Sequence, residues 1–235
     1  MSMSVSVIVP TKNEQANITH LLASLPAEVQ LVVCDASTDA TRSVVAEQRP
    51  LNTLILDAPG TIAEARQRGA LTSSGDILVF SDADVEFHSS YFDRLAEYTN
   101  WDGVCGAKLS PGAFASDYAL MLRTQIVVYR CLGIAAASGS NMAIKREAFT
   151  RIGGFRPHLR CNEDTELFLR GGRWGLRLRF DERLIVWARD HRRLHCGRAR
   201  KIAHSLVRNC LLYLTCRWPQ LPRLLEHDWG YWSGA

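Results

Sequence analysis

Four short apolar runs, rich in β-branched residues, recur at regular intervals through the first part of the chain. Such near-continuous apolar runs are typical of strands that are covered on both faces of a sheet. Helical patterns lie between them, and this alternation predicts an α/β domain with a parallel, doubly wound sheet. The runs are VSVIVP from Val5, VQLVVCD from Val29, NTLILDA from Asn52 and GDILVFSDAD from Gly75, and the helical patterns cover Glu14–Leu25, Asp39–Glu47 and Ile62–Ser73.

Polar residues follow three of these runs at the point where each strand ends. In open α/β sheets the ligand binds beyond the carboxyl ends of the strands. We therefore expect the three polar segments to meet in one crevice that acidic groups surround. The segments are Pro10–Glu14, Asp35–Asp39 and Ser81–Asp84.

The second part of the chain is less regular but continues the same class of fold. Because no repeat or linker interrupts it, we expect one domain over residues 1–198 and a C-terminal helical extension over residues 199–235 that packs on this domain. The predicted elements are a strand DGVCGAKL from Asp102, a helix Ala115–Leu132, a short strand Met142–Ile144, a helix that ends at Gly153–Gly154, a helix that begins near Asn162, two strands LRLRF and RLIVWA, and a helix Ala199–Cys216.

Composition narrows the class of protein. The chain has 235 residues, of which 47% are hydrophobic and 22% charged, so it suits a globular domain rather than a disordered chain. A formal net charge of +4 favours anionic partners such as phosphates and does not indicate nucleic acid.

The expected location is the cytoplasm. Seven cysteines without a CxxC pair indicate reduced thiols. The N-terminus lacks the pattern of a signal peptide, and the apolar stretch QIVVYRCLGIAAASG falls short of the ~20 residues of a membrane helix. Contact with a membrane surface stays open.

The triplet Asp82–Ala83–Asp84 ends a predicted strand with two neighbouring carboxylates. Because the two charges repel each other, we expect a divalent metal ion or a basic side chain near them, the alternative being a solvated turn. Mg²⁺ or Mn²⁺ would also allow a nucleotide diphosphate to approach. Asp35 can accept hydrogen bonds from a base or sugar, and Arg66 can reach a phosphate or form a surface ion pair. The triplet alone is weak evidence.

The triplet belongs to an ordered set of six segments: VSVIVPTKNEQANI, CDASTDATRSVV, APGTIAEARQRGAL, SGDILVFSDADV, SGSNMAIKREAFTRIGGF and NEDTELFLRGGRWG. In this order and at these spacings, the chain resembles the family 2 glycosyltransferases, which have the GT-A fold, as far as about Gly197. The resemblance implies an inverting hexosyltransferase that needs Mn²⁺ or Mg²⁺. Its donor would be a nucleotide-sugar, with UDP as the preferred base and GDP open, and its acceptor an unidentified hydroxyl, lipid-linked or not.

The resemblance also implies roles by position. Asp164 would be the catalytic base, Asp84 a metal ligand, and Gly139, Asn141 and Glu163 would line the acceptor site. Without the resemblance, the acidic residues near Asn162 would be ordinary first-turn charges of a helix. The implied donor-binding positions are Pro10, Thr11, Glu14, Asp35, Arg66, Asp82, Ala83 and Arg193.

His191 is a candidate second metal ligand. It follows the run RLIVWA in a basic loop, and some GT-A enzymes complete the metal site with a late histidine. An ordinary surface or core histidine is the alternative. The chain departs from the family pattern here, where Ser is frequent, and at Gln67, where many relatives have Asn.

Two other functions stay open, a nucleotidyltransferase and a catalytically silent nucleotide-binding module. The first would carry a glycine-rich basic loop after the first strand, where this chain reads PTKNEQAN. The second would typically lack one of the aspartates. The basic tail RARKIAHSLVRNCLLYLTCRWPQL contacts anionic lipid or a lipid-linked acceptor, caps the core, or builds a homodimer contact.

Overall fold

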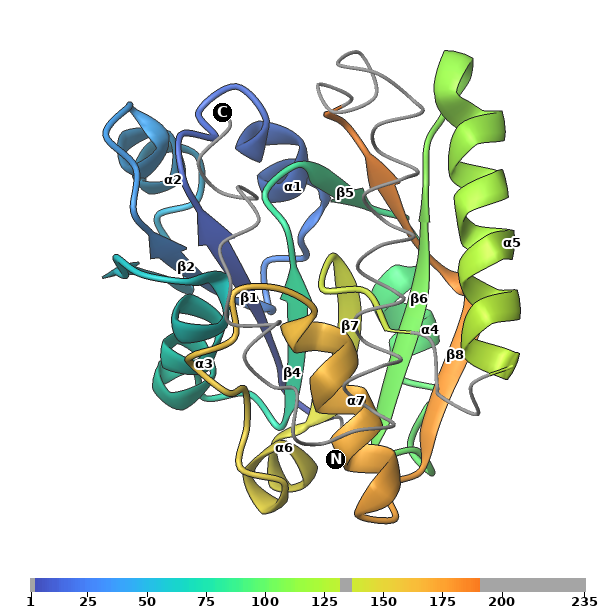
Figure 1. The fold of residues 1–235 in the computed structure, drawn as a ribbon. Coiled ribbons are helices and arrows are strands. Elements are labelled where there is room, and N and C mark those ends of the chain that lie inside the picture. Colours follow the sequence, from blue (N-terminus) through green and yellow to red (C-terminus); the bar gives the residue numbers. More distant parts are fainter. Residues whose placement is uncertain (1–2, 132–136, 191–235) are drawn as a thin grey trace.

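The computed structural model describes residues 3–131 and 137–190, which form an eight-stranded sheet with helices on both faces (Figure 1). In chain order the elements are β1 (Val5–Thr11), α1 (Ile18–Ser24), β2 (Gln30–Asp35), α2 (Thr41–Gln48), β3 (Thr53–Asp57), α3 (Ile62–Thr72), β4 (Ile77–Ser81), β5 (Val85–Phe87), α4 (Tyr91–Leu95), β6 (Gly103–Leu109), the 3-10 helix Gly112–Phe114, α5 (Ala115–Cys131), β7 (Asn141–Lys145), α6 (Arg146–Arg151), α7 (Glu163–Arg173) and β8 (Leu178–Ala188).

The strands lie in the order β3-β2-β1-β4-β7-β6-β8-β5. The pairs β1–β2, β1–β4, β2–β3 and β6–β8 are parallel, whereas β4–β7, β6–β7 and β5–β8 are antiparallel. The predicted α/β class with a mostly parallel sheet is confirmed. Because β1, β2 and β4 run in the same direction, the polar segments that follow them leave the same edge of the sheet.

The strand residues alternate between two apolar cores, one on each face of the sheet. Val7 and Val9 of β1 pack with residues of α1, α2 and α4, whereas Ile8 packs with residues of α3, α6 and α7. All three β1 side chains are completely buried. This double coverage explains why the strands read as near-continuous apolar runs.

Helix α3 is fixed at its start and near its end. The Thr61 hydroxyl accepts a hydrogen bond from the Glu64 N–H at 3.1 Å, and the Glu64 carboxylate accepts one from the Thr61 N–H at 2.8 Å, which makes a capping box. A Cβ on Gly69 would lie 2.5 Å from Ile8 Cγ2 and 2.7 Å from Cys34 Sγ. Glycine therefore lets α3 lie close against the sheet.

Two predicted helices begin later than expected. Helix α1 begins at Ile18 and not at Glu14, whose carbonyl accepts turn hydrogen bonds from the N–H groups of Asn17 and Ile18. Helix α2 begins at Thr41 and not at Asp39, whose carboxylate accepts hydrogen bonds from the Thr41 N–H and hydroxyl. Both corrections lengthen the polar loops at the carboxyl edge of the sheet.

The two strands predicted over LRLRF and RLIVWA are one strand, β8, so the predicted break is wrong. A bulge takes its place, where the pairing with β6 shifts after Gly106 and Asp181. The Asp181 carboxylate holds the bulge by accepting hydrogen bonds from the Arg183 N–H at 3.0 Å and its guanidinium at 2.8 Å. A Cβ on Gly106 would lie 1.9 Å from the Leu184 carbonyl oxygen, so the bulge requires glycine at this place.

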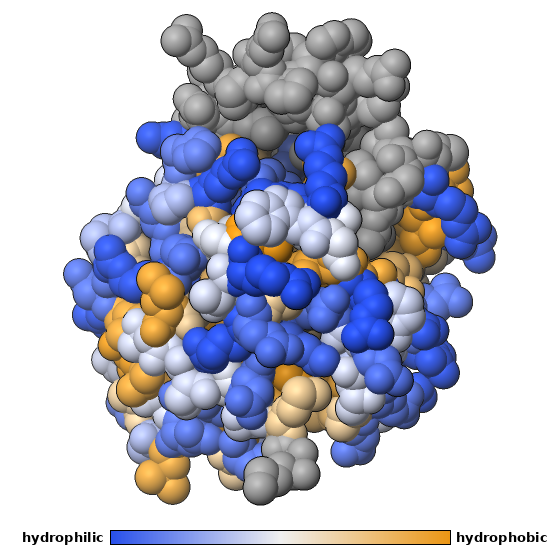
Figure 2. All heavy atoms as spheres, turned by 90° about the horizontal axis from the view of Figure 1, so that it is seen from below, coloured by the Kyte–Doolittle hydropathy of each residue, from blue (hydrophilic) through white to orange (hydrophobic). Residues whose placement is uncertain are grey.

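Four sequence predictions lie outside the described residues: His191, Arg193, the domain boundary at residue 198 and the extension 199–235. Within the described part of the chain, no helix combines the length and the apolar content that crossing a membrane requires. On the face shown in Figure 2, hydrophobic side chains are scattered among mainly hydrophilic ones.

Candidate active site

The polar loops after β1 and β2 meet at Asp35, which is 1% exposed. Its Oδ1 accepts hydrogen bonds of 2.6 Å from the hydroxyls of Thr11 and Ser37, and Arg42 Nε lies 3.2 Å from its Oδ2. These contacts satisfy a carboxylate that burial would otherwise penalise. The structure thus brings together Thr11 and Asp35, two predicted donor-binding residues, and fixes their geometry.

Two further predicted residues, Pro10 and Glu14, lie next to this pair. Pro10 is opposite Cys34 in the β1–β2 ladder. The Glu14 carboxylate accepts a hydrogen bond from the Asn17 amide at 2.6 Å, and its N–H donates to the Thr41 hydroxyl at 2.9 Å. Glu14 therefore orders the loop that leads from β1 to α1.

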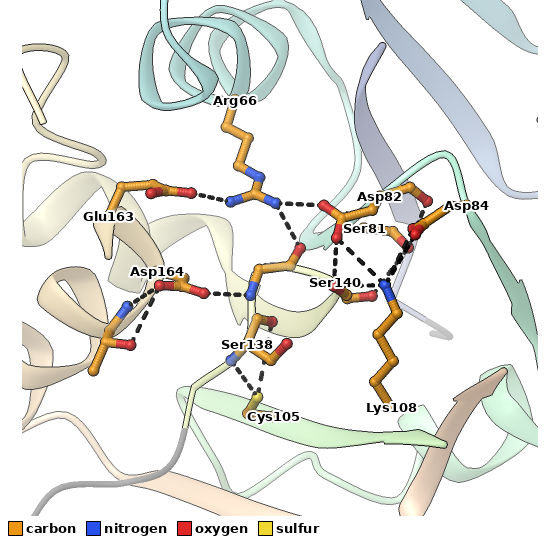
Figure 3. A network of polar contacts seen from close by, with 12 residues as sticks. Arg66, Ser81, Asp82, Asp84, Cys105, Lys108, Ser138, Ser140, Glu163 and Asp164 are labelled. Atoms are coloured by element: carbon orange, nitrogen blue, oxygen red, sulfur yellow. Dashed lines mark hydrogen bonds and ion pairs between the residues drawn. The ribbon is translucent and has the colours of Figure 1, made fainter. Parts of the chain in front are cut away.

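Arg66 of α3 is an internal link between the acidic turn and α7 (Figure 3). Its Nη2 lies 2.9 Å from Asp82 Oδ1, and its Nη1 lies 2.5 Å from Glu163 Oε1. The Arg66 side chain is 2% exposed and that of Glu163 9%. The alternative of a surface ion pair does not hold for Arg66–Glu163, because that pair is buried. The acceptor role implied for Glu163 stays a prediction.

The Gly139 peptide continues this link to Asp164. Its carbonyl accepts a hydrogen bond of 2.9 Å from Arg66 Nη2, and its N–H donates to Asp164 Oδ2 at 2.6 Å (Figure 3). Asp164 Oδ1 accepts a second hydrogen bond from the Thr165 N–H at 2.7 Å. A Cβ on Gly139 would lie 2.3 Å from Arg66 Nη1, so a larger residue at this position would collide with the Arg66 guanidinium.

Lys108 of β6 is a basic side chain next to the two carboxylates of the acidic triplet. Its Nζ lies 3.1 Å and 3.4 Å from the two carboxylate oxygens of Asp84 and 3.7 Å from Asp82 Oδ2 (Figure 3). It also lies 3.4 Å from the hydroxyl of Ser140, which in turn donates a hydrogen bond to Asp82 Oδ2. The sequence prediction missed Lys108, because nothing in the run DGVCGAKL shows which loop its side chain faces.

The acidic turn keeps Lys108 protonated. Burial alone would lower the pKa of the ammonium, but the carboxylates of Asp84 and Asp82 outweigh it and raise this pKa well above its usual range. The turn therefore faces a permanent positive charge. Ala83, between the two aspartates, is buried in the core with β4 and β5.

Asn141 does not line an acceptor site. It is completely buried, its amide nitrogen donates hydrogen bonds to the carbonyls of Ala107 at 2.9 Å and Leu184 at 2.8 Å, and its amide oxygen accepts one from the Tyr91 hydroxyl at 2.9 Å. The sequence prediction for Asn141 is therefore wrong. Its role is to join β7 to β6, β8 and α4.

Cys105 holds the turn that carries Gly139. Its sulfur accepts a hydrogen bond from the Ser138 N–H at 3.0 Å, and its thiol lies 3.0 Å from the Asn141 carbonyl oxygen. Burial raises the pKa of the Cys105 thiol, so it stays neutral and acts as a polar anchor.

The oxygen donors of the acidic turn fit a hard divalent ion. The side chains of Asp82 and Asp84 are 36% and 24% exposed, so both remain reachable from outside. Mg²⁺ commonly takes one or two carboxylates and fills its remaining positions with phosphate oxygens and water. Among the described residues, no group of three His, Cys, Asp or Glu side chains could hold a metal by itself.

Comparison with known proteins decides the family. Residues 6–153, more than half of the chain, match the model of Glycosyl transferase family 2. The chain belongs to this family. Membership of this family disfavours the nucleotidyltransferase alternative.

Two curated relatives are similar to this chain over most of its length. Succinoglycan biosynthesis protein ExoA of Rhizobium meliloti is 30% identical over 200 residues, which cover 75% of this chain and 60% of that protein. An uncharacterized glycosyltransferase of Haemophilus influenzae is 29% identical over 181 residues, which cover 70% of this chain and 60% of that protein. The chain thus spans about 60% of the length of each relative.

Two solved structures have the same fold as this chain. The mannosyltransferase PcManGT from Pyrobaculum calidifontis, in complex with GDP-Man and Mn²⁺, aligns with a TM-score of 0.64 at 24% identity over 80% of this chain and 57% of that one. Residues 1–349 of S. aureus TarS, in complex with UDP-GlcNAc, align with a TM-score of 0.63 at 20% identity over 80% and 59%. The predicted GT-A fold is confirmed.

Proposed function

We propose that this glycosyltransferase moves a hexose from a nucleotide-sugar, with UDP as the preferred base, to an acceptor hydroxyl and inverts the anomeric carbon. The observation that carries the proposal is the path of contacts Asp82–Arg66–Gly139–Asp164, with ends at 2.9 Å and 2.6 Å. It ties a carboxylate that can accept a proton to an acidic turn suited to a diphosphate. Family membership supports the same reaction class.

Asp164 is the proposed general base. The acceptor oxygen attacks the anomeric carbon opposite the diphosphate, the bond from that carbon to the diphosphate oxygen breaks, and Asp164 takes the acceptor proton. Asp164 Oδ1 already accepts hydrogen bonds from the N–H and the hydroxyl of Thr165, whereas Oδ2 accepts one from the Gly139 N–H and keeps a second lone pair for this proton. A positioned base typically contributes ~10²–10⁴-fold to the rate.

Asp84 is the proposed ligand of Mn²⁺ or Mg²⁺. The ion, when bound, stabilises the negative charge that builds on the departing diphosphate. Arg66 and Ser140 hold Asp82 beside this ligand. The neighbour solved with GDP-Man and Mn²⁺ supports a divalent ion, although it fixes neither the ion nor the donor of this chain.

Thr11 and Asp35 are the proposed contacts of the base and ribose, because they lie at the carboxyl ends of β1 and β2, where nucleotides bind in open sheets. One neighbour is solved with a GDP-sugar and another with a UDP-sugar. We therefore propose UDP as the first base to test and GDP as the second.

Release of the nucleoside diphosphate tests the proposed function. UDP- and GDP-hexoses are incubated with the protein and Mn²⁺, with Asp164→Asn and the control Asp93→Asn, an exposed aspartate in the first turn of α4. We expect release by the wild type, a fall of ~10²-fold or more in Asp164→Asn at unchanged donor affinity, and no change in Asp93→Asn. Full activity of Asp164→Asn would remove the base assignment.

Membrane contact, a lipid-linked acceptor, a homodimer and a helical extension over residues 199–235 are further parts of the proposal. All depend on residues beyond 190, outside the described part of the chain. Liposome pelleting of the full chain and of a variant without residues 217–235 tests the first of them. Equal pelleting of the two proteins would show that residues 217–235 do not bind the membrane.

A further inference from the structure

The ammonium of Lys108 contacts both carboxylate oxygens of Asp84, the proposed ligand of a divalent ion. Its distances of 3.1 Å and 3.4 Å to the two Asp84 oxygens place it across both of them. An ion such as Mg²⁺ contacts its ligand oxygens at about 2.0–2.1 Å. The ion and the ammonium would thus share the same carboxylate at a separation of a few ångströms.

The charges of the turn explain why Lys108 takes this place. Asp82 and Asp84 carry two negative charges, and Arg66 neutralises Asp82 from the interior. Among the described residues, Lys108 is the only cation that forms an ion pair with Asp84. A divalent ion and an ammonium repel each other at this separation, so they oppose each other on one carboxylate.

We propose that Lys108 is the resident counter-cation of the acidic turn and that a divalent ion binds Asp84 by displacing its ammonium. The inference rests on the proposed metal site at Asp84. In its position on Asp84 the ammonium also lies 3.7 Å from Asp82 Oδ2 and 3.4 Å from the Ser140 hydroxyl, and these two groups can hold it after displacement. A lysine suits such an exchange, because its point charge sits on a flexible stem.

Direct Mn²⁺ binding tests the proposal without any measurement of transfer. Free Mn²⁺ is counted by electron paramagnetic resonance in titrations of the wild type, Lys108→Met, Lys108→Arg and Lys145→Met. Methionine keeps an unbranched apolar stem without the charge, and arginine keeps the charge. Lys145 is the matched control, because its ammonium binds the Thr99 carbonyl at 2.7 Å near the far end of β7.

We expect Lys108→Met to bind Mn²⁺ at least about tenfold more tightly than the wild type, because the competing charge is gone. Lys108→Arg and Lys145→Met should bind as the wild type does. Thermal melts give a second readout. In EDTA, Lys108→Met should melt below the wild type, and Mn²⁺ should raise its Tm by more than it raises that of the wild type.

The outcomes separate this inference from the proposed function. Equal or weaker Mn²⁺ binding by Lys108→Met overturns the competition and leaves the metal site standing. Failure of all four proteins to bind Mn²⁺ overturns both the competition and the metal requirement, and leaves transfer to be decided by diphosphate release. If Lys108→Met does not fold, as judged by circular dichroism, Lys108→Gln replaces it under the same expectations.

Discussion

Replacing Arg66 by methionine should destabilise the protein strongly. The substitution keeps most of the apolar stem but removes a guanidinium that is 2% exposed and contacts Asp82, Glu163 and the Gly139 carbonyl. The largest loss concerns Glu163, whose side chain is 9% exposed and would be left as a buried charge. Asp82, at 36% exposure, gains water in compensation.

The expected magnitude follows from this burial. Removing one partner of a buried ion pair typically costs about 3–5 kcal/mol, whereas an exposed partner adds at most about 1 kcal/mol. We therefore expect the free energy of unfolding of Arg66→Met to fall by at least about 3 kcal/mol. For a domain of this size, that loss corresponds to a fall in Tm of about 6 °C or more.

Urea denaturation and thermal melts of four proteins measure the effect. They are the wild type, Arg66→Met, the double variant Arg66→Met/Glu163→Gln, and the control Arg68→Met. Arg68 lies on the same helix but is exposed, with one hydrogen bond of 2.6 Å to the Asp57 carbonyl, so its loss should stay within about 0.5 kcal/mol. The double variant should lose less than Arg66→Met, because glutamine leaves no buried charge.

Two results would refute this reasoning. The first is a Tm of Arg66→Met within about 2 °C of the wild type, which would mean that the ion pair contributes little net stability. The second is a double variant that is less stable than Arg66→Met, which would mean that the negative charge of Glu163 is favourable without its partner.

Three further predictions concern single residues. Gly139→Ala places a Cβ 2.3 Å from Arg66 Nη1, so it should move the peptide that holds Asp164 and lower diphosphate release by about 10²-fold; an unchanged rate would contradict this link. Gly106→Ala places a Cβ 1.9 Å from the Leu184 carbonyl oxygen and should lower the free energy of unfolding by about 3 kcal/mol, measured in urea; an unchanged free energy would show that the bulge does not require glycine. Burial raises the pKa of Cys34 from 9.0 to about 12, against the opposing effect of Arg68. Because the folded state favours the neutral thiol, the stability that this preference contributes is complete below about pH 9 and is lost as pH rises toward 12. Cys34→Ala should therefore lose less stability than the wild type between about pH 8 and pH 10.5.

The first half of the fold follows from the sequence, because β1, β2 and β4 are covered on both faces, whereas the edge strand β3 is only partly buried. The run from Val5 is apolar at nearly every position, and Val7, Ile8 and Val9 are indeed all completely buried. A strand that is buried on both faces is apolar at nearly every position, so it can be recognised from the local sequence. The bulge in β8 is different, because it depends on the glycine that happens to face it in β6.

The candidate site was predictable only in part, for a related reason. Strand ends locate Asp35 and the acidic turn, since carboxyl ends of parallel strands share one edge. The role of Lys108 and the pairing of Arg66 with Glu163 are recognised only in the structure, because the partners lie far apart in the chain, 24 residues for Lys108–Asp84 and 97 residues for Arg66–Glu163. The family resemblance implied an acceptor role for Asn141, whereas its hydrogen bonds lie inside the sheet.

Isothermal titration of the protein with UDP- and GDP-hexoses, in Mn²⁺ and again in EDTA, tests the central claim most directly. We expect one nucleotide-sugar to bind in Mn²⁺, with an affinity that falls about tenfold or more both in EDTA and in Asp84→Asn. The same affinity for every donor with Mn²⁺, with EDTA and in Asp84→Asn would contradict it.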